Sequence, residues 1–267
     1  MVHHFRYDNG VLYAENVPVP LLAKEFGTPF YLYSAATMRR HIGVMRNAFN
    51  GINTLVAYAL KANSNQGILT LLAREGAGAD VVSLGELERA IAAGIPPEKI
   101  VFSGVAKTRA EMARALELGI HCFNLESDPE LFRLNEIAGQ MGKIAPVSLR
   151  INPNVDARTH AKISTGKAQD KFGIPYKRAG EVYGGIARSE NLAAIGVDMH
   201  IGSQVTELAP FDDAFSLLAE LVIALRKAGH AITHVDVGGG LAVPYKSDNN
   251  PPPDPLAYAA IVRKRIA

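Results

Sequence analysis

The chain has 267 residues, of which 48% are hydrophobic and 20% are charged, and its 28 Lys and Arg residues against 26 Asp and Glu residues leave a formal net charge of +2. This composition is that of a soluble globular protein, and the length fits one large α/β domain. The nearly balanced charge excludes the strong basic excess of a nucleic-acid binder and favours a small anionic ligand.

The first part of the chain, residues 1–33, predicts a short β-rich segment. Asn9 and Gly10 form the pair that favours a type I′ hairpin turn, and they lie between two strand-like runs, FRYD and VLYAEN. The aromatic run FYLY at 30–33 predicts a further strand. We expect this segment to form a unit separate from residues 34–267.

From residue 54 the sequence alternates short apolar, β-branched runs with stretches of helical period, which is the pattern of a parallel sheet with crossover helices. Helices are predicted at 85–94 and at 109–119, the second ending at Gly119. The regular spacing of the first four runs is typical of a (β/α) barrel. Seven runs are predicted to be strands, at 54–60, 79–83, 100–104, 122–126, 147–152, 195–201 and 234–239.

Two segments interrupt this regular spacing. Residues 152–175 are polar and aperiodic, and they predict a long active-site loop at the carboxyl end of the fifth strand. Residues 247–255 are of low complexity and predict an exposed loop, with a helix after it. No eighth strand follows within the sequence, and seven strands leave a barrel with two unpaired edges. The predicted fold is therefore α/β, a (β/α)8-type TIM barrel with about seven of its eight strands.

Lys61 is the first candidate for chemistry, because it follows directly on the first predicted strand in the run YALKAN. A lysine that points from a strand end into the mouth of a barrel is desolvated, and its amine then becomes available for Schiff-base formation. The alternative is a surface lysine at the start of a loop. The strand-end position favours the first interpretation.

Candidates for binding a ring and a phosphate follow the last two predicted strands. His200 can stack on a planar cofactor or move a proton, and the alternative is a half-buried histidine bonded to a backbone carbonyl. The hydroxyl of Ser203 suits a phosphate. A triple glycine after the seventh strand allows backbone N–H groups to reach an anion, with a flexible turn as the alternative. The run consists of Gly238, Gly239 and Gly240.

Two charged residues lie in predicted strands. Arg150 in the fifth strand could place charge next to a cofactor or a carboxylate, or pair with an acid inside the barrel. Asp80, at the start of the second strand, is either a hydrogen-bonding residue of the interior or a catalytic one.

No metal site, membrane span or export signal is predicted. The histidines other than His200 show no ligand spacing with one another, and the single Cys122 excludes a disulfide framework and a cysteine-based zinc site. Cys122 lies in an apolar run and is predicted to be a core residue. Residues 1–10 lack the apolar core of a signal peptide, and no apolar stretch reaches the roughly 20 residues of a membrane span, so we expect a cytoplasmic protein.

Six motifs, in this order along the chain, together resemble those of the fold-type III decarboxylases that use pyridoxal phosphate, and most closely their diaminopimelate decarboxylase branch. The resemblance runs through essentially the whole chain and implies the alanine racemase-like barrel of that family. The motifs are YALKAN at 58–63, ADVVSLGEL at 79–87, RINP at 150–153, HAKISTG with KFGI at 160–174, MHIGSQ at 199–204 and HVDVGGGL at 234–241.

The resemblance implies a role for each candidate residue. Lys61 would hold pyridoxal 5′-phosphate as a Schiff base, and His200 would stack on its pyridine ring. The remaining assignments are Ser203 and Gly238 to Gly240 around the phosphate, Asp80 and Arg150 lining the cofactor pocket, and Thr165, Gly166 and Lys171 in the substrate loop. The implied reaction is decarboxylation of meso-2,6-diaminopimelate to L-lysine and carbon dioxide, and a homodimer is implied for the complete enzyme.

The sequence departs from the family pattern in two places. Ala242 stands where the family run GGGLG has its last glycine. The family's eighth strand with its EPGR motif, and its C-terminal β domain, are not found in this sequence. We therefore interpret the chain as the N-terminal portion of such an enzyme, with residues 1–33 packing on that β domain in the whole protein, and we expect it not to turn over substrate by itself.

Two other functions are compatible with these residues. A barrel that binds pyridoxal phosphate without decarboxylation would retain a chromophore linked to Lys61 but show no amino-acid turnover. An ornithine- or arginine-type decarboxylase would be distinguished by assaying the three substrates in the complete enzyme. The substrate-loop motifs favour the diaminopimelate branch over both.

Overall fold

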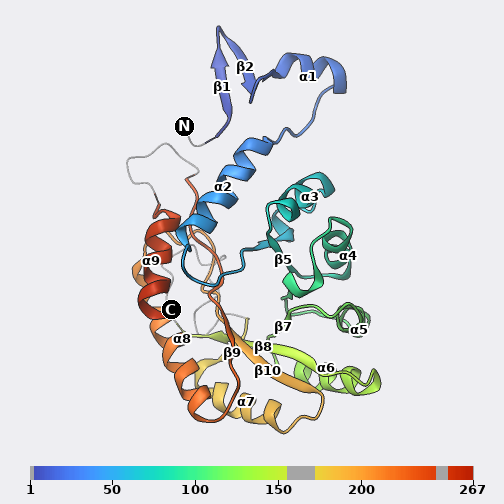
Figure 1. The fold of residues 1–267 in the computed structure, drawn as a ribbon, viewed down its shortest axis with the longest axis vertical. Helices are drawn as coiled ribbons and strands as arrows, with labels where there is room; N and C mark the ends of the chain where they lie inside the picture. The colour runs from blue at the N-terminus through green and yellow to red at the C-terminus, as the bar shows by residue number, and fades with distance from the viewer. Residues whose placement is uncertain (1–2, 155–171, 245–251, 267) are drawn as a thin grey trace.

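The computed structural model describes residues 3–154, 172–244 and 252–266. They form a small antiparallel sheet at the amino terminus and a larger, curved parallel sheet with helices around it (Figure 1). The parallel sheet is an open barrel, so the predicted α/β barrel class is confirmed. Among the described residues, no helix is both long enough and apolar enough to cross a membrane.

The amino-terminal sheet is built on the predicted hairpin. Strands β1 (Phe5–Asp8) and β2 (Val11–Ala14) pair antiparallel, and β3 (Val17–Pro18) adds to β2. Asn9 and Gly10 have φ angles of 47° and 77°, the positive values that a type I′ turn requires at both central residues. The prediction of a hairpin at this pair is confirmed.

Two features of this segment differ from the sequence-based expectation. Residues 30–33 form no strand, since the described residues offer them no neighbouring strand and Tyr31 is 90% exposed. β propensity describes how well side chains fit a pleated surface, and here there is no such surface to join. Helix α1 (Val19–Phe26) was not predicted, although Pro20 in its first turn and Gly27 after its last residue are typical start and stop signals.

The curved sheet contains all seven predicted strands. They pair in parallel in the order β11-β10-β8-β7-β6-β5-β4, which leaves β4 and β11 at the two edges, and the short β9 (Ile174–Pro175) pairs with the end of β8. The strands are β4 (Ala57–Ala59), β5 (Gly78–Val81), β6 (Ile100–Phe102), β7 (Cys122–Leu125), β8 (Ala145–Asn152), β10 (Leu192–Asp198) and β11 (His234–Asp236).

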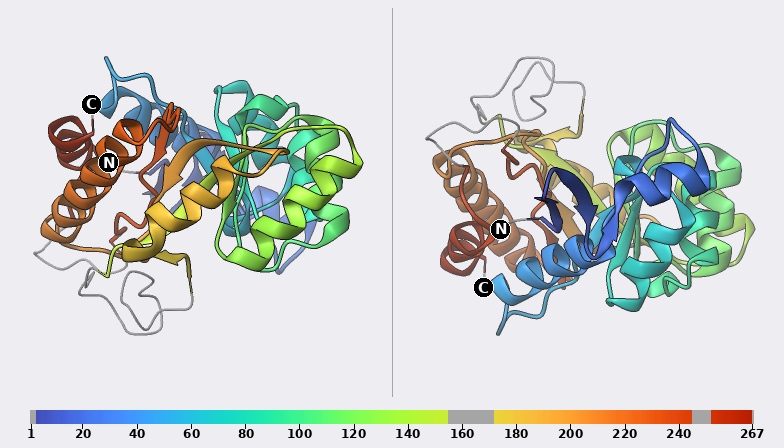
Figure 2. Two further views of the ribbon diagram at one scale, coloured as in Figure 1. Left: turned by 90° about the horizontal axis from the view of Figure 1, so that it is seen from below. Right: turned by 90° about the horizontal axis from the view of Figure 1, so that it is seen from above.

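Helices lie on the outer side of this sheet, as the two views in Figure 2 show. Both predicted helices are present, and α5 has a capping box between Thr108 and Glu111 and ends at Gly119 in the left-handed conformation. The helices are α2 (Ala35–Ala48), α3 (Gln66–Arg74), α4 (Leu84–Ala92), α5 (Arg109–Leu118), α6 (Asp128–Gln140), α7 (Ala179–Ala187), α8 (Ala209–Lys227) and α9 (Pro255–Arg265).

Alternation of side chains along β7 separates an outer apolar layer from an inner polar one. Phe123 points outward, where it stacks on Phe102 with ring centroids 6.2 Å apart. Its neighbours point to the concave face: the Cys122 thiol lies 3.7 Å from His234, and the Asn124 amide donates to Asp236 at 3.3 Å. The period of two along a strand thus places polar groups inside the half-barrel and the apolar core between sheet and helices.

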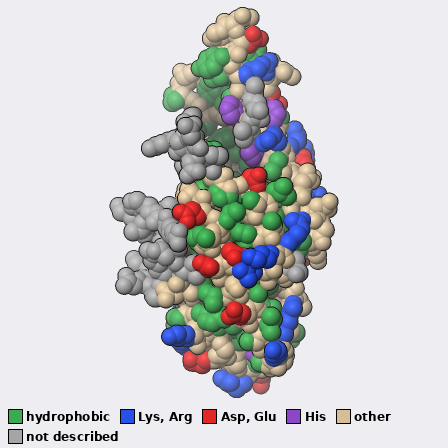
Figure 3. All heavy atoms as spheres, turned by 90° about the vertical axis from the view of Figure 1, so that its left-hand side faces the viewer, with side chains coloured by type: hydrophobic (Ala, Val, Ile, Leu, Met, Phe, Trp, Pro, Cys, Tyr) green, Lys and Arg blue, Asp and Glu red, His purple; other side chains and the backbone are tan. Residues whose placement is uncertain are grey.

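Helix α9 connects the two ends of the half-barrel. It packs against both α2 and α8, beside which it lies in Figure 1. The Arg263 guanidinium donates to the carbonyls of Ala48 and Asn50 at 2.9 and 2.6 Å, and Arg265 pairs with Asp212 at 2.7 Å. On the face shown in Figure 3, acidic and basic side chains are interspersed and form no patch of one sign.

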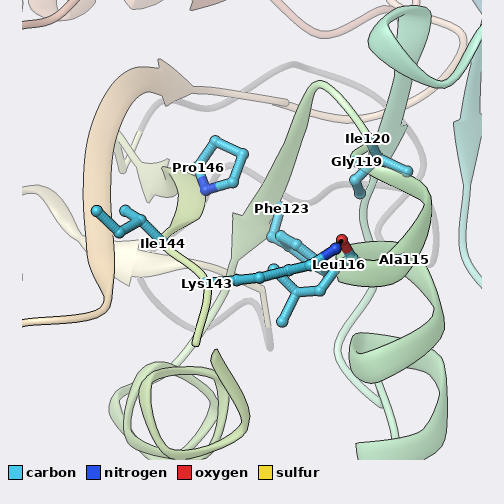
Figure 4. Close-up of a pocket in the computed structure, with 8 residues that line it drawn as sticks. All are labelled: Ala115, Leu116, Gly119, Ile120, Phe123, Lys143, Ile144 and Pro146. Carbon is cyan, nitrogen blue, oxygen red and sulfur yellow. Dashed lines mark hydrogen bonds between the residues drawn. The ribbon is translucent and has the colours of Figure 1, made fainter. Parts of the chain in front are cut away.

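A cavity of about 260 Å³ lies on the outer side of the sheet, between α5 and the start of β8. Figure 4 shows Lys143 stretched along it toward Leu116. The Lys143 ammonium donates to the carbonyls of Leu116 and Glu117 at 2.7 and 3.2 Å, so it caps the carboxyl end of α5. This cavity is structural and lies away from the concave face.

Candidate active site

Five predicted site residues converge at the carboxyl ends of the parallel strands. Lys61 lies in the 3-10 helix η1 (Leu60–Ala62) directly after β4, Asp80 lies in β5, and Arg150 lies in β8. His200 follows β10 by two residues and Gly238 follows β11 by two residues. Because parallel strands all end at the same edge, residues up to 177 positions apart in the sequence meet there.

Lys61 has an exposed side chain. The expectation that the barrel mouth desolvates its amine is therefore wrong for this structure, because β4 is an edge strand and leaves the side chain open. The Lys61 charge nevertheless acts on two other site residues: it opposes the rise that burial causes in the pKa of Asp80, and it adds to the fall that burial causes in the pKa of His200. The lysine thus lies within electrostatic reach of the carboxyl and the imidazole.

The Asp80 carboxyl is a polar group of the site that is only partly hydrogen-bonded. Its Oδ1 atom is buried without a hydrogen-bond partner among the described residues. Burial raises the pKa of Asp80 to about 6; the hydrogen bond from Ser103 opposes this rise and the nearby Asp236 adds to it. A buried carboxyl oxygen without a partner is the kind of atom that a bound polar group satisfies.

The His200 imidazole is neutral at physiological pH. Burial lowers the pKa of His200 to about 4, and the charges of Arg150 and Lys61 lower it further. The backbone N–H of Gly239 donates to Nδ1 at 3.3 Å, so the proton of the neutral ring lies on Nε2. The site therefore contains an uncharged aromatic face held in one tautomer.

The triple glycine is required first by close contact between two backbones. Gly238 and Gly240 have φ angles of 67° and 91°. A Cβ atom on Gly238 would lie 2.5 Å from the Met199 carbonyl oxygen, and one on Gly240 would lie 1.9 Å from the Gly202 carbonyl oxygen. Side chains at these two positions would push the 199–202 segment, and with it His200, out of place.

Gly239 is different from its two neighbours. A Cβ atom there would meet nothing within 4 Å, so this glycine faces open space next to His200. The expectation that all three N–H groups face an anion is not fully met, because the Gly238 N–H already donates to Asp236 at 2.8 Å. Ser203, the other expected phosphate ligand, is exposed.

Arg150 pairs with an acid inside the barrel, which was one of its two predicted roles. Its guanidinium donates to Glu126 at 3.1 Å and lies 4.9 Å over the ring of Phe172. Only 12% of the Arg150 side chain is exposed. The positive charge is therefore fixed at the end of β8, and Glu126 Oε2 is buried without a hydrogen-bond partner among the described residues.

A buried ion network supports this corner of the site and was not predicted. Lys107 Nζ is fully buried, donates to the carbonyls of Gly104 and Asn124 at 2.7 Å each, and pairs with Glu130. Glu130 in turn accepts the Glu126 backbone N–H at 2.7 Å. The available signal was the position of these charged residues: Lys107 and Glu130 follow the predicted strands at 100–104 and 122–126 by three and four residues, and Glu126 ends the second of these strands.

Two aspartates of the concave face were also missed. Asp198 ends β10 and Asp236 ends β11, and the two are register partners. Burial, with Asp236 and other nearby carboxylates, raises the pKa of Asp198 well above its usual value, although the charge of Arg150 opposes this. Thr165, Gly166 and Lys171, the expected substrate-loop residues, lie outside the described part of the chain.

These residues fit pyridoxal phosphate. Lys61 offers an amine for its aldehyde, His200 a neutral ring for stacking, and Gly239 an open position beside that ring. The buried Oδ1 of Asp80 and the fixed charge of Arg150 can contact polar substituents. The arrangement can therefore hold a planar, anionic aldehyde, and it can bring an amine and a carboxyl close to it.

Comparisons with known proteins agree with this chemistry. A family model described as the pyridoxal binding domain of pyridoxal-dependent decarboxylases matches residues 35–266. The diaminopimelate decarboxylase of Vibrio cholerae serotype O1 is 52% identical to the chain over 264 residues, which cover 98% of this chain and 63% of the relative.

Solved structures that resemble the chain include diaminopimelate decarboxylases. The diaminopimelate decarboxylase of Helicobacter pylori complexed with L-lysine matches with a TM-score of 0.90 and 41% identity, over 93% of this chain and 62% of that one. The corresponding enzyme of M. jannaschii matches with a TM-score of 0.92 and 36% identity, over 98% and 62%. The chain thus spans slightly less than two thirds of the length of these relatives.

Proposed function

The chain belongs to the pyridoxal-dependent decarboxylases, whose pyridoxal-binding domain it matches over residues 35–266, and we propose that it serves the decarboxylation of meso-2,6-diaminopimelate to L-lysine and carbon dioxide. The substrate is inferred from the relatives, which are named diaminopimelate decarboxylases. L-lysine, which is bound in the Helicobacter pylori structure, is the product of the proposed reaction.

One observation is central to this proposal: Lys61 lies within electrostatic reach of both a neutral buried imidazole and a buried carboxyl oxygen without a partner. An amine near an aromatic face and a proton-exchanging carboxyl is what a lysine-bound pyridoxal cofactor needs. When bound, pyridoxal phosphate supplies an electron sink for the carbanion that remains after carbon dioxide departs.

In the proposed mechanism, Lys61 would hold the cofactor through its aldehyde. This side chain is exposed at the end of β4, so its amine is accessible to such a group. His200 would stack on the cofactor ring, and its own Nδ1 accepts a hydrogen bond from the Gly239 N–H. Ser203 and the run from Gly238 to Gly240 would surround the phosphate of the cofactor.

Asp80 and Arg150 set the charge of the site. With a pKa of about 6, the Asp80 carboxyl exchanges its proton near neutral pH, so it can hold the proton that Lys61 Nζ gives up. Arg150 offers a fixed positive charge to a carboxylate or phosphate, and Glu126 and Phe172 hold its guanidinium in place. Both roles place polar side chains around the cofactor without requiring a metal ion.

We also propose that residues 1–33 form a unit apart from residues 34–267 and pack on a further β domain in the whole protein. The start of the family match at residue 35 supports this division. Large side chains on the segment are exposed, among them Tyr7 at 74%, Phe26 at 73% and Tyr31 at 90%. Exposed aromatic side chains of this kind suit an interface.

The substrate is tested by adding meso-diaminopimelate, L-ornithine or L-arginine to the protein loaded with pyridoxal phosphate. We expect diaminopimelate to change the cofactor absorbance at the lowest concentration of the three, and to release carbon dioxide from the full-length protein. An equal response to all three amino acids would contradict the proposed substrate. A response to none of them, with the cofactor bound, would contradict the proposed function.

A further inference from the structure

Three metal-ligating side chains meet at the amino-terminal end of the half-barrel, opposite the candidate active site. His121 precedes β7, Cys122 begins β7, and His234 begins β11. One potential ligand atom from each residue lies within 4.8 Å of the others, and Cys122 Sγ lies 3.7 Å from His234 Nε2. The expectation that the histidines show no ligand arrangement holds along the sequence but is wrong in three dimensions.

These distances are close to those of a tetrahedral site. With zinc bonds of about 2.3 Å to sulfur and about 2.0 Å to nitrogen, two ligand atoms of one ion lie roughly 3.3 to 3.6 Å apart. The Cys122–His234 pair already has this separation at 3.7 Å. The most distant pair, at up to 4.8 Å, needs to approach by roughly 1 Å, which rotation of an imidazole can supply.

The fold holds His234 in this position. Gly196 is its register partner in β10, and a Cβ atom on Gly196 would lie 2.2 Å from the His234 ring. The imidazole therefore packs directly on the backbone of β10. His234 Nδ1 is buried without a hydrogen-bond partner among the described residues, so the ring is held by packing and has an unsatisfied nitrogen.

A cavity gives access to the two imidazoles. It measures about 570 Å³, and His121 and His234 line it together with Glu98, Lys99 and Arg46. Its lining side chains offer one carboxylate, Glu98, and the neutral oxygens of Asn53 and Thr54, which are fewer than the roughly six to eight oxygen ligands that Ca²⁺ takes. Nitrogen and thiolate ligands instead select zinc and similar ions.

We propose that His121, Cys122 and His234 form a binding site for Zn²⁺ or a similar transition-metal ion, with a fourth position open to the cavity. Three protein ligands and one open position are the pattern of a zinc site that exchanges its fourth ligand. Binding requires the thiolate of Cys122. Because burial raises the pKa of this thiol, the ion has to displace a proton.

Cobalt is the probe for this site, because a thiolate bound to Co²⁺ gives a charge-transfer absorption that imidazole ligands do not give. Cys122 is the only cysteine of the chain, so such a band identifies the site without ambiguity. We expect one equivalent of Co²⁺ to produce the band and Zn²⁺ to displace it.

Substitution of each proposed ligand tests whether that residue binds the ion. Cys122→Ala should abolish the band, and His234→Gln and His121→Gln should each weaken Co²⁺ binding by at least about tenfold. His41→Gln is the matched control, because His41 is exposed on α2, and it should leave the affinity unchanged. Circular dichroism checks that each variant is folded. His121, which is only half-buried, tolerates substitution better than Cys122.

Two results would overturn the proposal. One is the absence of saturable Co²⁺ or Zn²⁺ binding to the folded protein. The other is binding that persists with the same spectrum in Cys122→Ala, since the ion would then lie elsewhere, for example at His200. Neither result depends on decarboxylase activity, so the test is independent of the proposed function.

Discussion

The two ends of the concave face contain polar clusters that differ in charge: one consists of ion pairs and the other does not. At the carboxyl end, charged groups neutralise one another: Lys107 pairs with Glu130, and Arg150 pairs with Glu126. At the amino end, the cluster of His121, Cys122 and His234 contains two imidazoles and a thiol and no ion pair among the described residues.

This difference follows from which part of each strand supplies the residues. At the carboxyl end, loops and glycine turns add to the strand residues, so backbone N–H groups and long charged side chains can converge. At the amino end, the first residues of β7 and β11 and the residue before β7 supply the ligands, and the sheet fixes the positions of their backbones. One end is therefore suited to an anionic organic group and the other to a small cation.

The largest expected effect is at Lys61. Lys61→Ala should abolish the covalent adduct that borohydride reduction forms between pyridoxal phosphate and the protein, because Lys61 is the lysine that acts on Asp80 and His200 among the described residues. Peptide mass mapping locates the adduct. Lys24→Ala is the control, since Lys24 is exposed on α1 and far along the chain from the site, and it should leave the adduct intact.

An adduct that persists in Lys61→Ala at another lysine would contradict the assignment. Loss of the adduct should leave Co²⁺ binding at the amino end unchanged. Loss of both would show that the two ends are not independent.

Disruption of the buried ion network should have the next largest effect, a loss of stability. Lys107→Met should lower the free energy of unfolding by about 3–5 kcal/mol, because it leaves the Glu130 carboxylate buried and unpaired. Arg109→Ala is the control: its pair with Glu136 is exposed, so the cost should be about 0–1 kcal/mol. Urea unfolding measures both values, and equal costs would contradict a special role for the network.

Alanine substitutions of glycines test the two ends separately, because each new methyl group meets different neighbouring atoms. Gly240→Ala should cost at least about 2 kcal/mol, because φ is 91° there and the new Cβ atom would lie 1.9 Å from the Gly202 carbonyl oxygen. It should also weaken cofactor binding. Gly239→Ala meets nothing within 4 Å, so it should change stability by less than about 0.5 kcal/mol.

Gly196→Ala is the counterpart at the amino end, where the new methyl group would displace the His234 ring. We expect it to weaken Co²⁺ binding and to leave cofactor binding unchanged. Thermal unfolding and the two binding titrations report these effects. A Gly240→Ala protein that is as stable as Gly239→Ala would contradict the close backbone contact at the carboxyl end.

A further set of effects concerns pH, and these arise at both ends. Burial lowers the pKa of His200 and of His234 to about 4, so the unfolded chain takes up protons more readily than the folded one between about pH 4 and 6.5. Stability from each histidine is complete above pH 6.5 and is lost as the pH falls toward 4. At pH 4.5 the loss should be about 2–3 kcal/mol for each residue.

Asp80 acts in the opposite direction. Its raised pKa of about 6 gives stability that is complete below its unfolded value and is lost as the pH rises through 6. His200→Gln and His234→Gln should each reduce the fall in stability between pH 6.5 and 4.5, and Asp80→Asn should make it steeper. Urea unfolding at the two pH values measures this. An unchanged pH dependence in both histidine variants would contradict neutral imidazoles at the two ends.

Much of the fold was predictable because it rests on local patterns. The alternating apolar runs gave all seven strands, although β4 is shorter than predicted and Lys61 lies in a 3-10 helix after it. The turn at Asn9 and Gly10 followed from the chemistry of those two residues. The strand expected at 30–33 failed because a strand needs a partner, and partner availability is not a local property.

By itself, the sequence determined the parallel sheet and the lysine, histidine and glycines at its carboxyl edge, because strand ends are local features and parallel strands end together. Only the tertiary structure decided that Lys61 is exposed on an edge strand, that Asp80 keeps an unpaired oxygen, and that Lys107 is buried in an ion network. It also brought His121 and Cys122 to His234, more than 110 positions along the chain. Burial and long-range contact depend on how the sheet curves and which strands become its edges, and no local pattern of residues encodes either.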